Sequence, residues 1–139
     1  MLFERIAVTF RRQQVMATLG AELEAVEPGV VTIALPYSEA LTQQHGFLHA
    51  GVVATVMDSA CGYAAYTLMP EDAGVLSIEF KTNLLAPARG KRFRFVGTVV
   101  KAGRTISVCE GKAFADDDKL IATMTCTLMT IRDREGVTG

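Results

Sequence analysis

The spacing of apolar side chains predicts a helix over residues 2–14. Leu2, Ile6 and Phe10 recur every four positions, and arginine and glutamine side chains flank them. One apolar side and one polar side at this period are typical of an amphipathic helix. The sequence therefore predicts a short amphipathic helix at the start of the chain.

Two apolar runs then predict a β-hairpin. They cover residues 17–26 and 30–36, and Glu27-Pro28-Gly29 separates them. Pro-Gly between apolar runs is a turn signal, because Pro presets the first turn position and Gly tolerates the backbone angles of the second. Residues 37–48, which follow, show no regular period and are expected to be irregular.

A second helix is predicted from His49 to about Leu68. This segment is rich in Ala, Val and Met, it lacks proline, and it is apolar on almost every side. A helix of this kind is enclosed by other structure. The turn-forming residues 70–74, Pro-Glu-Asp-Ala-Gly, end it.

The remainder of the chain predicts four strands joined by short turns. They cover residues 75–84, 92–101, 105–115 and 120–131. In the first of them, strict alternation places Leu76, Ile78 and Phe80 on one face and Glu79 and Lys81 on the other. Short turns imply antiparallel neighbours among these strands.

Together these elements predict an α+β fold in which one long antiparallel sheet wraps around a central helix. The 139 residues fit a single domain, and the polar tail over 132–139 is expected to be frayed. A single apolar helix needs a curled sheet to bury all its sides. Such a sheet leaves open edges, so we expect at least a dimer.

Composition narrows the classes of function. Half of the residues are hydrophobic and the formal net charge is −1, which gives no electrostatic reason to expect nucleic acid or an anionic membrane as the partner. Three cysteines without a CxxC pair are typical of reduced thiols, and we expect a cytoplasmic location. Residues 50–69 are long enough to suggest a membrane span. The carboxylate of Asp58 at their centre would cost roughly 2.5–3.5 kcal/mol there, so a buried core helix is the better interpretation.

Asp58 is the unusual residue of this sequence. It carries the only formal charge among the 31 residues between Glu39 and Glu71, and it lies on the apolar helix. A carboxylate in such surroundings must be paired, hydrogen-bonded or neutralised, and groups of this kind concentrate at functional sites. On composition alone, a structural role as a cap or an ion-pair partner is equally compatible.

The start of the same helix supplies a second feature. His45 and His49 lie just before it, with the amide of Gln43, and its first backbone N–H groups have no partners inside the helix. They can stabilise a developing oxyanion. Asp58 follows nine residues after His49, about 13 Å along the axis. A substrate carbonyl at the helix start would not reach that carboxylate, so either a second subunit meets it or the substrate lies along the groove.

These residues resemble the motifs of the PaaI-type branch of the hotdog-fold acyl-CoA thioesterases. The family has an amide residue, a glycine three positions later, His-Gly-Gly, and an aspartate nine residues after the histidine. Here these positions are Gln43, Gly46, His49-Ala50-Gly51 and Asp58. A family serine or threonine about ten residues before a proline is matched by Ser77. Two departures are notable: Ala50 replaces the first motif glycine, and Gln43 replaces the family asparagine.

The resemblance implies a role for each residue. Asp58 would be the general base that activates water or the nucleophile that forms a transient anhydride. Ser77 would orient the water, and the Ala50 N–H and Gln43 would polarise the thioester carbonyl. His49 and Gly51 would complete the helix start, His49 more as a residue that shapes the loop than as a proton shuttle.

The same resemblance assigns Gly103 and Arg104, with Lys101, to the nucleotide part of coenzyme A. Coenzyme A is then part of the substrate, and no separate cofactor is expected. The acyl group remains open among aromatic, medium-chain and long-chain groups. A zinc site is disfavoured because the spacing of His45, His49 and Asp58 matches no common pattern. Cys61 is expected to be a buried thiol of raised pKa.

The expected function is therefore hydrolysis of acyl-CoA in a homodimer, or a dimer of dimers, with active sites at the subunit interface. Two alternatives remain open at this point. A hotdog dehydratase or hydratase would need a His-Phe-Pro-Gly loop, which the sequence lacks. An acyl-CoA sensor would bind its ligand without turnover.

Overall fold

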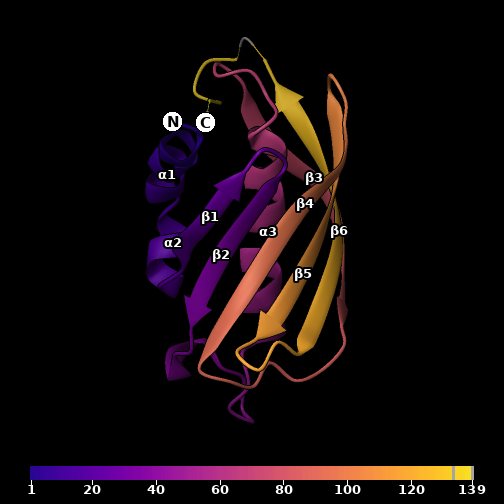
Figure 1. Ribbon diagram of the computed structural model, residues 1–139. Helices are drawn as coiled ribbons and strands as arrows, with labels where there is room; N and C mark the ends of the chain where they lie inside the picture. Colours follow the sequence, from indigo (N-terminus) through magenta and orange to yellow (C-terminus); the bar gives the residue numbers. More distant parts are fainter. Residues whose placement is uncertain (133, 139) are drawn as a thin grey trace.

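A computed structural model describes residues 1–132 and 134–138 (Figure 1). Positions 133 and 139 of the tail predicted to be frayed lie outside the described residues. The chain begins with α1 (Leu2–Arg12), which buries Ile6, Ala7 and Phe10, as the amphipathic pattern predicts. A second short helix, α2 (Gln14–Leu19), follows at once and ends at Gly20, whose positive φ terminates it.

The predicted hairpin is present, but its first strand is shorter than expected. It consists of β1 (Glu22–Glu27) and β2 (Val30–Pro36), paired antiparallel across the turn in which Gly29 has a positive φ of 78°. The prediction of strand for residues 17–19 is wrong, because these residues continue α2, in which Met16 is fully buried. A short 3-10 helix (Glu39–Leu41) lies in the segment predicted to be irregular.

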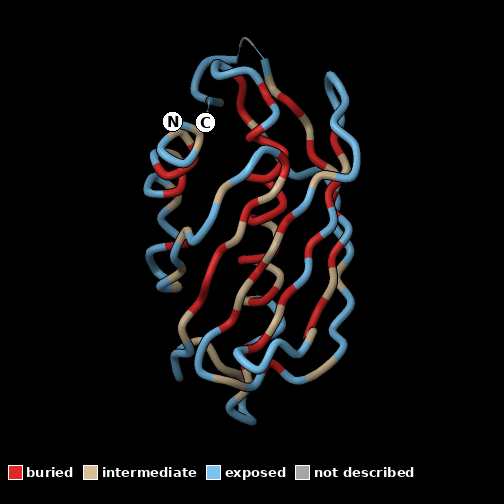
Figure 2. Tube along the Cα trace, in the orientation of Figure 1, coloured by how far each residue is buried: buried red, intermediate tan, exposed pale blue. Residues whose placement is uncertain are grey.

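The buried helix is α3 (Ala50–Tyr66), and it packs against β2 and all four later strands. Its residues from Ser59 to Tyr66 are buried without exception, in agreement with an apolar pattern on every side. The later strands are β3 (Gly74–Leu84), β4 (Arg92–Ala102), β5 (Ile106–Ala115) and β6 (Leu120–Ile131). Figure 2 shows the buried positions concentrated on α3 and on the strands beside it.

The six strands of the described residues form one antiparallel sheet with the order β1-β2-β4-β5-β6-β3. The sheet curves around α3, and α1 and α2 lie on the outer side of that helix, beside β1 (Figure 1). This is the predicted α+β hotdog fold. One neighbour relation was predicted wrongly: β3 does not pair with β4, because β2 occupies that edge of β4, and β3 pairs with β6 instead.

The predicted alternation along β3 is also wrong, because a β-bulge interrupts its register between Ser77 and Glu79. Ser77 lies opposite Leu128 and Phe80 lies opposite Cys126, and both of these partners are buried beneath α3. Residues directly opposite each other in a sheet share a face, so Ser77 and Phe80 both face the helix side. Leu76, Ile78 and Phe80 therefore do not form one continuous face, and the bulge redirects Ser77 toward α3.

Candidate active site

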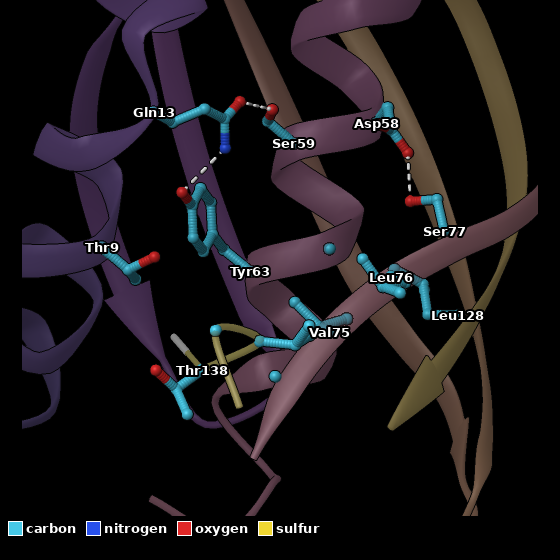
Figure 3. Close-up of a pocket in the computed structure, with 14 residues that line it drawn as sticks. Thr9, Gln13, Asp58, Ser59, Tyr63, Val75, Leu76, Ser77, Leu128 and Thr138 are labelled. Carbon is cyan, nitrogen blue, oxygen red and sulfur yellow. Dashed lines mark hydrogen bonds between the residues drawn. The ribbon is translucent and has the colours of Figure 1, made fainter. Parts of the chain in front are cut away.

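Asp58 and Ser77 form the centre of the site (Figure 3). Asp58 lies in the middle of α3 and is half-buried, and Ser77 lies on β3 just before the bulge. The Ser77 hydroxyl donates a hydrogen bond of 2.6 Å to Asp58 Oδ1. A hydroxyl–carboxylate bond of this length is charge-assisted and fixes the carboxylate rotamer. Strict alternation would place Ser77 on the same face as Glu79 and Lys81; the bulge between Ser77 and Glu79 lets Ser77 face α3 instead.

A thiol also contacts this carboxylate. Cys126 on β6 donates a weak hydrogen bond from Sγ to Asp58 Oδ1, at 3.7 Å, and its sulfur lies 4.0 Å from Ser77 Oγ. A hydrogen bond with Cys126, together with burial, raises the pKa of Cys61, as expected for a buried thiol at this position. The sequence analysis did not assign Cys126 to the site. The one indication was its position on the buried side of β6, a strand in which buried and less buried residues alternate. All three cysteines are free and buried.

Asp58 and Ser77 open onto a cavity of about 480 Å³. Its wall combines α1, α3, β3 and the C-terminal segment, in which Gly136, Val137 and Thr138 take part. Gly62, one helical turn after Asp58, leaves the space beside the carboxylate open because it has no side chain. The cavity lies in the size range of small-molecule sites.

The start of α3 has the predicted features. His49 is the N-cap residue, and its Nδ1 accepts a hydrogen bond of 2.8 Å from the Gly51 N–H. His49 therefore shapes the helix start. Because the Gly51 N–H already donates to His49, it is not free to bind another acceptor. Within the described part of the chain, the Ala50 N–H donates to no acceptor. That N–H is the free donor at the positive end of the helix.

Gln43 holds the loop before α3. Its Oε1 accepts hydrogen bonds from the backbone N–H groups of His45 and Phe47, so the amide oxygen fixes the loop. Gln43 and Ala50 line a second cavity of about 500 Å³, together with Leu84 and Leu85 at the end of β3. Asp58 does not line this cavity. A single chain thus brings Asp58 and Ser77 together and leaves Gln43 and Ala50 at another place.

The predicted nucleotide-binding residues lie at the turn between β4 and β5. Gly103 closes this turn, because its N–H donates 2.9 Å to the Ile106 carbonyl and a Cβ would overlap that same oxygen. Lys101 and Arg104 are exposed there. Arg132, which sequence reasoning missed, donates from Nη2 to the Arg104 carbonyl at 3.0 Å and adds a third cation. None of these residues lines the two cavities above.

Two structural findings bear on the other classes of function. Within residues 1–132 and 134–138, no three His, Cys, Asp or Glu side chains gather as a metal site would require. No helix in the same residues is long and apolar enough to cross a membrane.

Comparison with known proteins gives the family. The model of the thioesterase superfamily matches residues 45–122. A thioesterase family protein from Silicibacter pomeroyi has 54% identity and a TM-score of 0.92, over 95% of this chain and 99% of its own. The PaaI protein of E. coli shares the fold, with 14% identity and a TM-score of 0.86 over 99% of this chain and 95% of its own.

Relatives with named activities include the following two. The 1,4-dihydroxy-2-naphthoyl-CoA hydrolase of Listeria monocytogenes is 26% identical over 85% of this chain and 96% of its own. The medium/long-chain acyl-CoA thioesterase YigI of Salmonella typhimurium is 26% identical over 80% of this chain and 81% of its own. The matched segment contains Asp58, Ser77 and the start of α3, and the family resemblance predicted from these motifs is confirmed. This chain belongs to the thioesterase superfamily.

Proposed function

We propose that the protein hydrolyses acyl-CoA thioesters and that Asp58 is the group that acts on the reacting atoms. The observation that carries this proposal is the 2.6 Å hydrogen bond between Ser77 Oγ and Asp58 Oδ1 at a cavity of substrate size. This bond commits the Ser77 proton to Oδ1. It leaves Oδ2 for chemistry, since Oδ2 has no hydrogen bond to any described residue.

The reaction requires one base and one oxyanion donor. In the general-base route, Asp58 takes a proton from water, the water oxygen bonds to the thioester carbon, and the C–S bond breaks as the proton passes to the leaving thiolate. In the nucleophilic route, an Asp58 carboxylate oxygen bonds to the thioester carbon, the C–S bond breaks and coenzyme A leaves as the thiolate, which takes a proton from water; a water molecule then cleaves the anhydride into the free acid and the Asp58 carboxylate. In both, the Ala50 N–H and the Gln43 amide stabilise the negative charge on the carbonyl oxygen. After a single turnover in H₂¹⁸O, label in Asp58 identifies the nucleophilic route with water attacking the Asp58 carboxyl carbon of the anhydride, because the general-base route places the label in the product acid alone.

We further propose that the complete site forms between two copies of the chain. β3 is an edge strand whose outer side pairs with no described strand, and it exposes Leu76, Ile78 and Phe80. An edge of this kind is a template for pairing. The beginning of β3 lines the Asp58 cavity, and its end borders the cavity of Gln43 and Ala50. Antiparallel pairing of two β3 strands would therefore place the Asp58 of one copy beside the helix start of the other.

The direct test of the activity is thiol release from a panel of acyl-CoAs. Asp58→Asn keeps the size of the side chain and removes the base, so the rate should fall by about 10²–10⁴-fold. Asp72→Asn makes the same chemical change at an exposed residue outside the cavity and should match the wild type. Equal rates for Asp58→Asn and the wild type would refute the proposal. Tight binding of acyl-CoA without turnover would identify a binding module instead.

Subunit complementation tests the shared site. Ala50→Pro removes the free N–H at the first helical position, where proline is tolerated, and the extended His49 before it (φ −61°, ψ 138°) suits a proline neighbour. We expect Ala50→Pro and Asp58→Asn each to be inactive alone. Co-expressed as a mixed dimer, they should recover up to about a quarter of wild-type activity, since half the dimers then contain one intact site. A mixed dimer without activity would contradict the shared site.

A further inference from the structure

A buried thiol contacts the carboxylate that the proposed hydrolysis uses. Cys126 is fully buried on β6, where it lies opposite Phe80, and its Sγ donates to Asp58 Oδ1 at 3.7 Å. The same sulfur lies 4.0 Å from Ser77 Oγ. The described residues that line the Asp58 cavity do not include Cys126. This thiol therefore touches the carboxylate without being in reach of a molecule in the cavity.

One oxygen of the carboxylate receives two donors from two neighbouring strands. The Ser77 hydroxyl on β3 donates to Asp58 Oδ1 at 2.6 Å, and the Cys126 thiol on β6 donates to the same atom. Rotation of the carboxylate would break both bonds at once, so the two donors together fix the position of Oδ2. Hydrogen bonds to an ionised carboxylate also favour its charged form. Both effects serve a group that must act as a base or a nucleophile.

Cys61, one turn after Asp58 on α3, determines where the Cys126 proton points. A hydrogen bond with Cys126 is the largest cause that raises the pKa of Cys61, so Cys61 keeps its proton and donates it to the Cys126 sulfur. The Cys126 proton is then left for Asp58. The bond from Cys61 lowers the pKa of Cys126, whereas burial and the charge of Asp58 raise it. Cys126 holds its proton while Asp58 is charged, because a thiolate there would place two like charges side by side.

The other polar side chains of the cavity bond to one another (Figure 3). The Ser59 hydroxyl donates 2.6 Å to Gln13 Oε1, and Gln13 Nε2 donates 2.8 Å to the Tyr63 hydroxyl oxygen. Of the described residues that line the cavity, only Asp58 and Tyr63 can ionise. Burial raises the pKa of Tyr63, and the two thiols are neutral at acidic pH. Among the groups that face this site, only Asp58 therefore changes its charge in the acidic range.

We propose that Cys126 is a positioning residue whose thiol, oriented by Cys61, favours the ionised form of Asp58 and holds Oδ2 in place for the reaction. The thiol acts only as a hydrogen-bond donor, and it exchanges neither protons nor electrons with the substrate. This inference rests on the proposed function, because it assigns a role toward the base or nucleophile of that same reaction.

The test compares substitutions that remove or keep the donor. Cys126→Ala removes it, and Cys126→Ser keeps an O–H in its place. Cys126→Ala should move the acidic limb of the pH profile of kcat/KM to higher pH by about 0.5–1 unit, which below the limb is about a three- to tenfold loss of rate. KM should not change, because the thiol lies outside the cavity wall. Cys126→Ser should retain the wild-type limb.

Cys109→Ala is the matched control. It removes the thiol that lies directly opposite Cys126 on β5, and in the described structure this thiol has no hydrogen bond to Asp58. The acidic limb of Cys109→Ala should therefore coincide with that of the wild type. A limb that moves equally in Cys109→Ala and Cys126→Ala would overturn the assignment to Cys126.

A second measurement does not depend on turnover. ¹³C NMR of protein labelled at the aspartate carboxyl carbons follows the titration of Asp58, whose signal is the one missing from Asp58→Asn. The titration midpoint should move to higher pH in Cys126→Ala by the same amount as the acidic limb. If this midpoint moves and no acyl-CoA is hydrolysed, the hydrogen bond from Cys126 is established and the proposed hydrolysis alone is wrong.

The remaining outcomes decide the role of the thiol. If the protein hydrolyses acyl-CoA and neither the limb nor the midpoint moves in Cys126→Ala, the proposal is refuted. An equal shift in Cys126→Ser would assign the effect to the volume of the sulfur and would also overturn it. Should Cys126→Ala unfold in a thermal melt, Cys126→Val takes its place, because valine lacks a donor and is well suited to a strand.

Discussion

Two glycines lie opposite each other on β4 and β5, beneath the helix that carries Asp58. Gly97 and Gly111 are direct cross-strand partners, and both are buried. Neither has a positive φ, so alanine meets no backbone strain at either position. The two sites therefore differ only in what a new methyl group would contact.

A methyl group at Gly97 would meet helix backbone. It would lie 2.6 Å from the Cys61 nitrogen and closer still to the carbonyl group of Ala60. The shortest ordinary contact is 3.4 Å, so α3 must move away from β4 by nearly 1 Å, because no side-chain rotation relieves a backbone contact. At Gly111 the methyl would meet the Met57 side chain at 2.7 Å, which can rotate away.

We expect Gly97→Ala to reduce the free energy of unfolding by about 3 kcal/mol and Gly111→Ala by about 1 kcal/mol or less. Urea denaturation followed by circular dichroism measures both, at one fixed protein concentration because the proposed dimer would make the midpoint depend on concentration. Gly97→Ala should also lower kcat, since Asp58 is two residues from the displaced Ala60. Equal stability of the two variants would refute the conclusion that helix backbone is the limiting contact.

Three further predictions concern the thiols, the edge strand and the basic turn. Burial raises the pKa of Cys109 from near 9 to about 12, so the folded state favours the neutral thiol and its contribution to stability falls as the pH rises from 9 to 12. Between pH 8 and pH 10, urea denaturation should show the wild type losing about 1 kcal/mol more than Cys109→Ala, and equal losses would contradict the burial effect. Ile78→Asp places a charge on the exposed edge of β3. If this edge forms the proposed dimer, the variant should sediment as a monomer in sedimentation equilibrium and the wild type as a dimer, and equal masses would exclude this edge as the interface. Arg104→Ala should raise KM for acyl-CoA by about tenfold with kcat unchanged, and a fall in kcat alone would argue against a phosphate contact.

Much of the fold could be predicted because local patterns and burial agree. The apolar character of residues 50–66 on every side predicted an enclosed helix, and one helix enclosed by consecutive strands predicted the curled sheet. The predictions of secondary structure and strand pairing failed where contacts between distant parts of the chain determine the structure. Residues 17–19 join a helix because Met16 packs into the core, and β3 leaves β4 because the hairpin strand β2 already occupies that edge.

In the candidate site too, residues with a local sequence signal could be predicted, and residues brought in by long-range contacts could not. Asp58 was identified from its isolation as a charge, and His49 from its place before the helix, because both signals are local in sequence. The partnership of Asp58 with Ser77 depends on a bulge, and alternation cannot indicate a bulge from one strand alone. Cys126 and Gln13 enter the site from β6 and the junction of α1 and α2, and no spacing relates them to Asp58.

The sequence by itself determined which side chains must be buried, where the central helix begins, and that a lone carboxylate lies within it. These properties follow from hydrophobic period and helix-start chemistry, which act over a few residues. Only the tertiary structure decided what that carboxylate touches and which residues stay apart from it. It places Gln43 and Ala50 at the end of β3 and Asp58 near its beginning, because a rigid helix and an extended strand hold the two places apart within one chain.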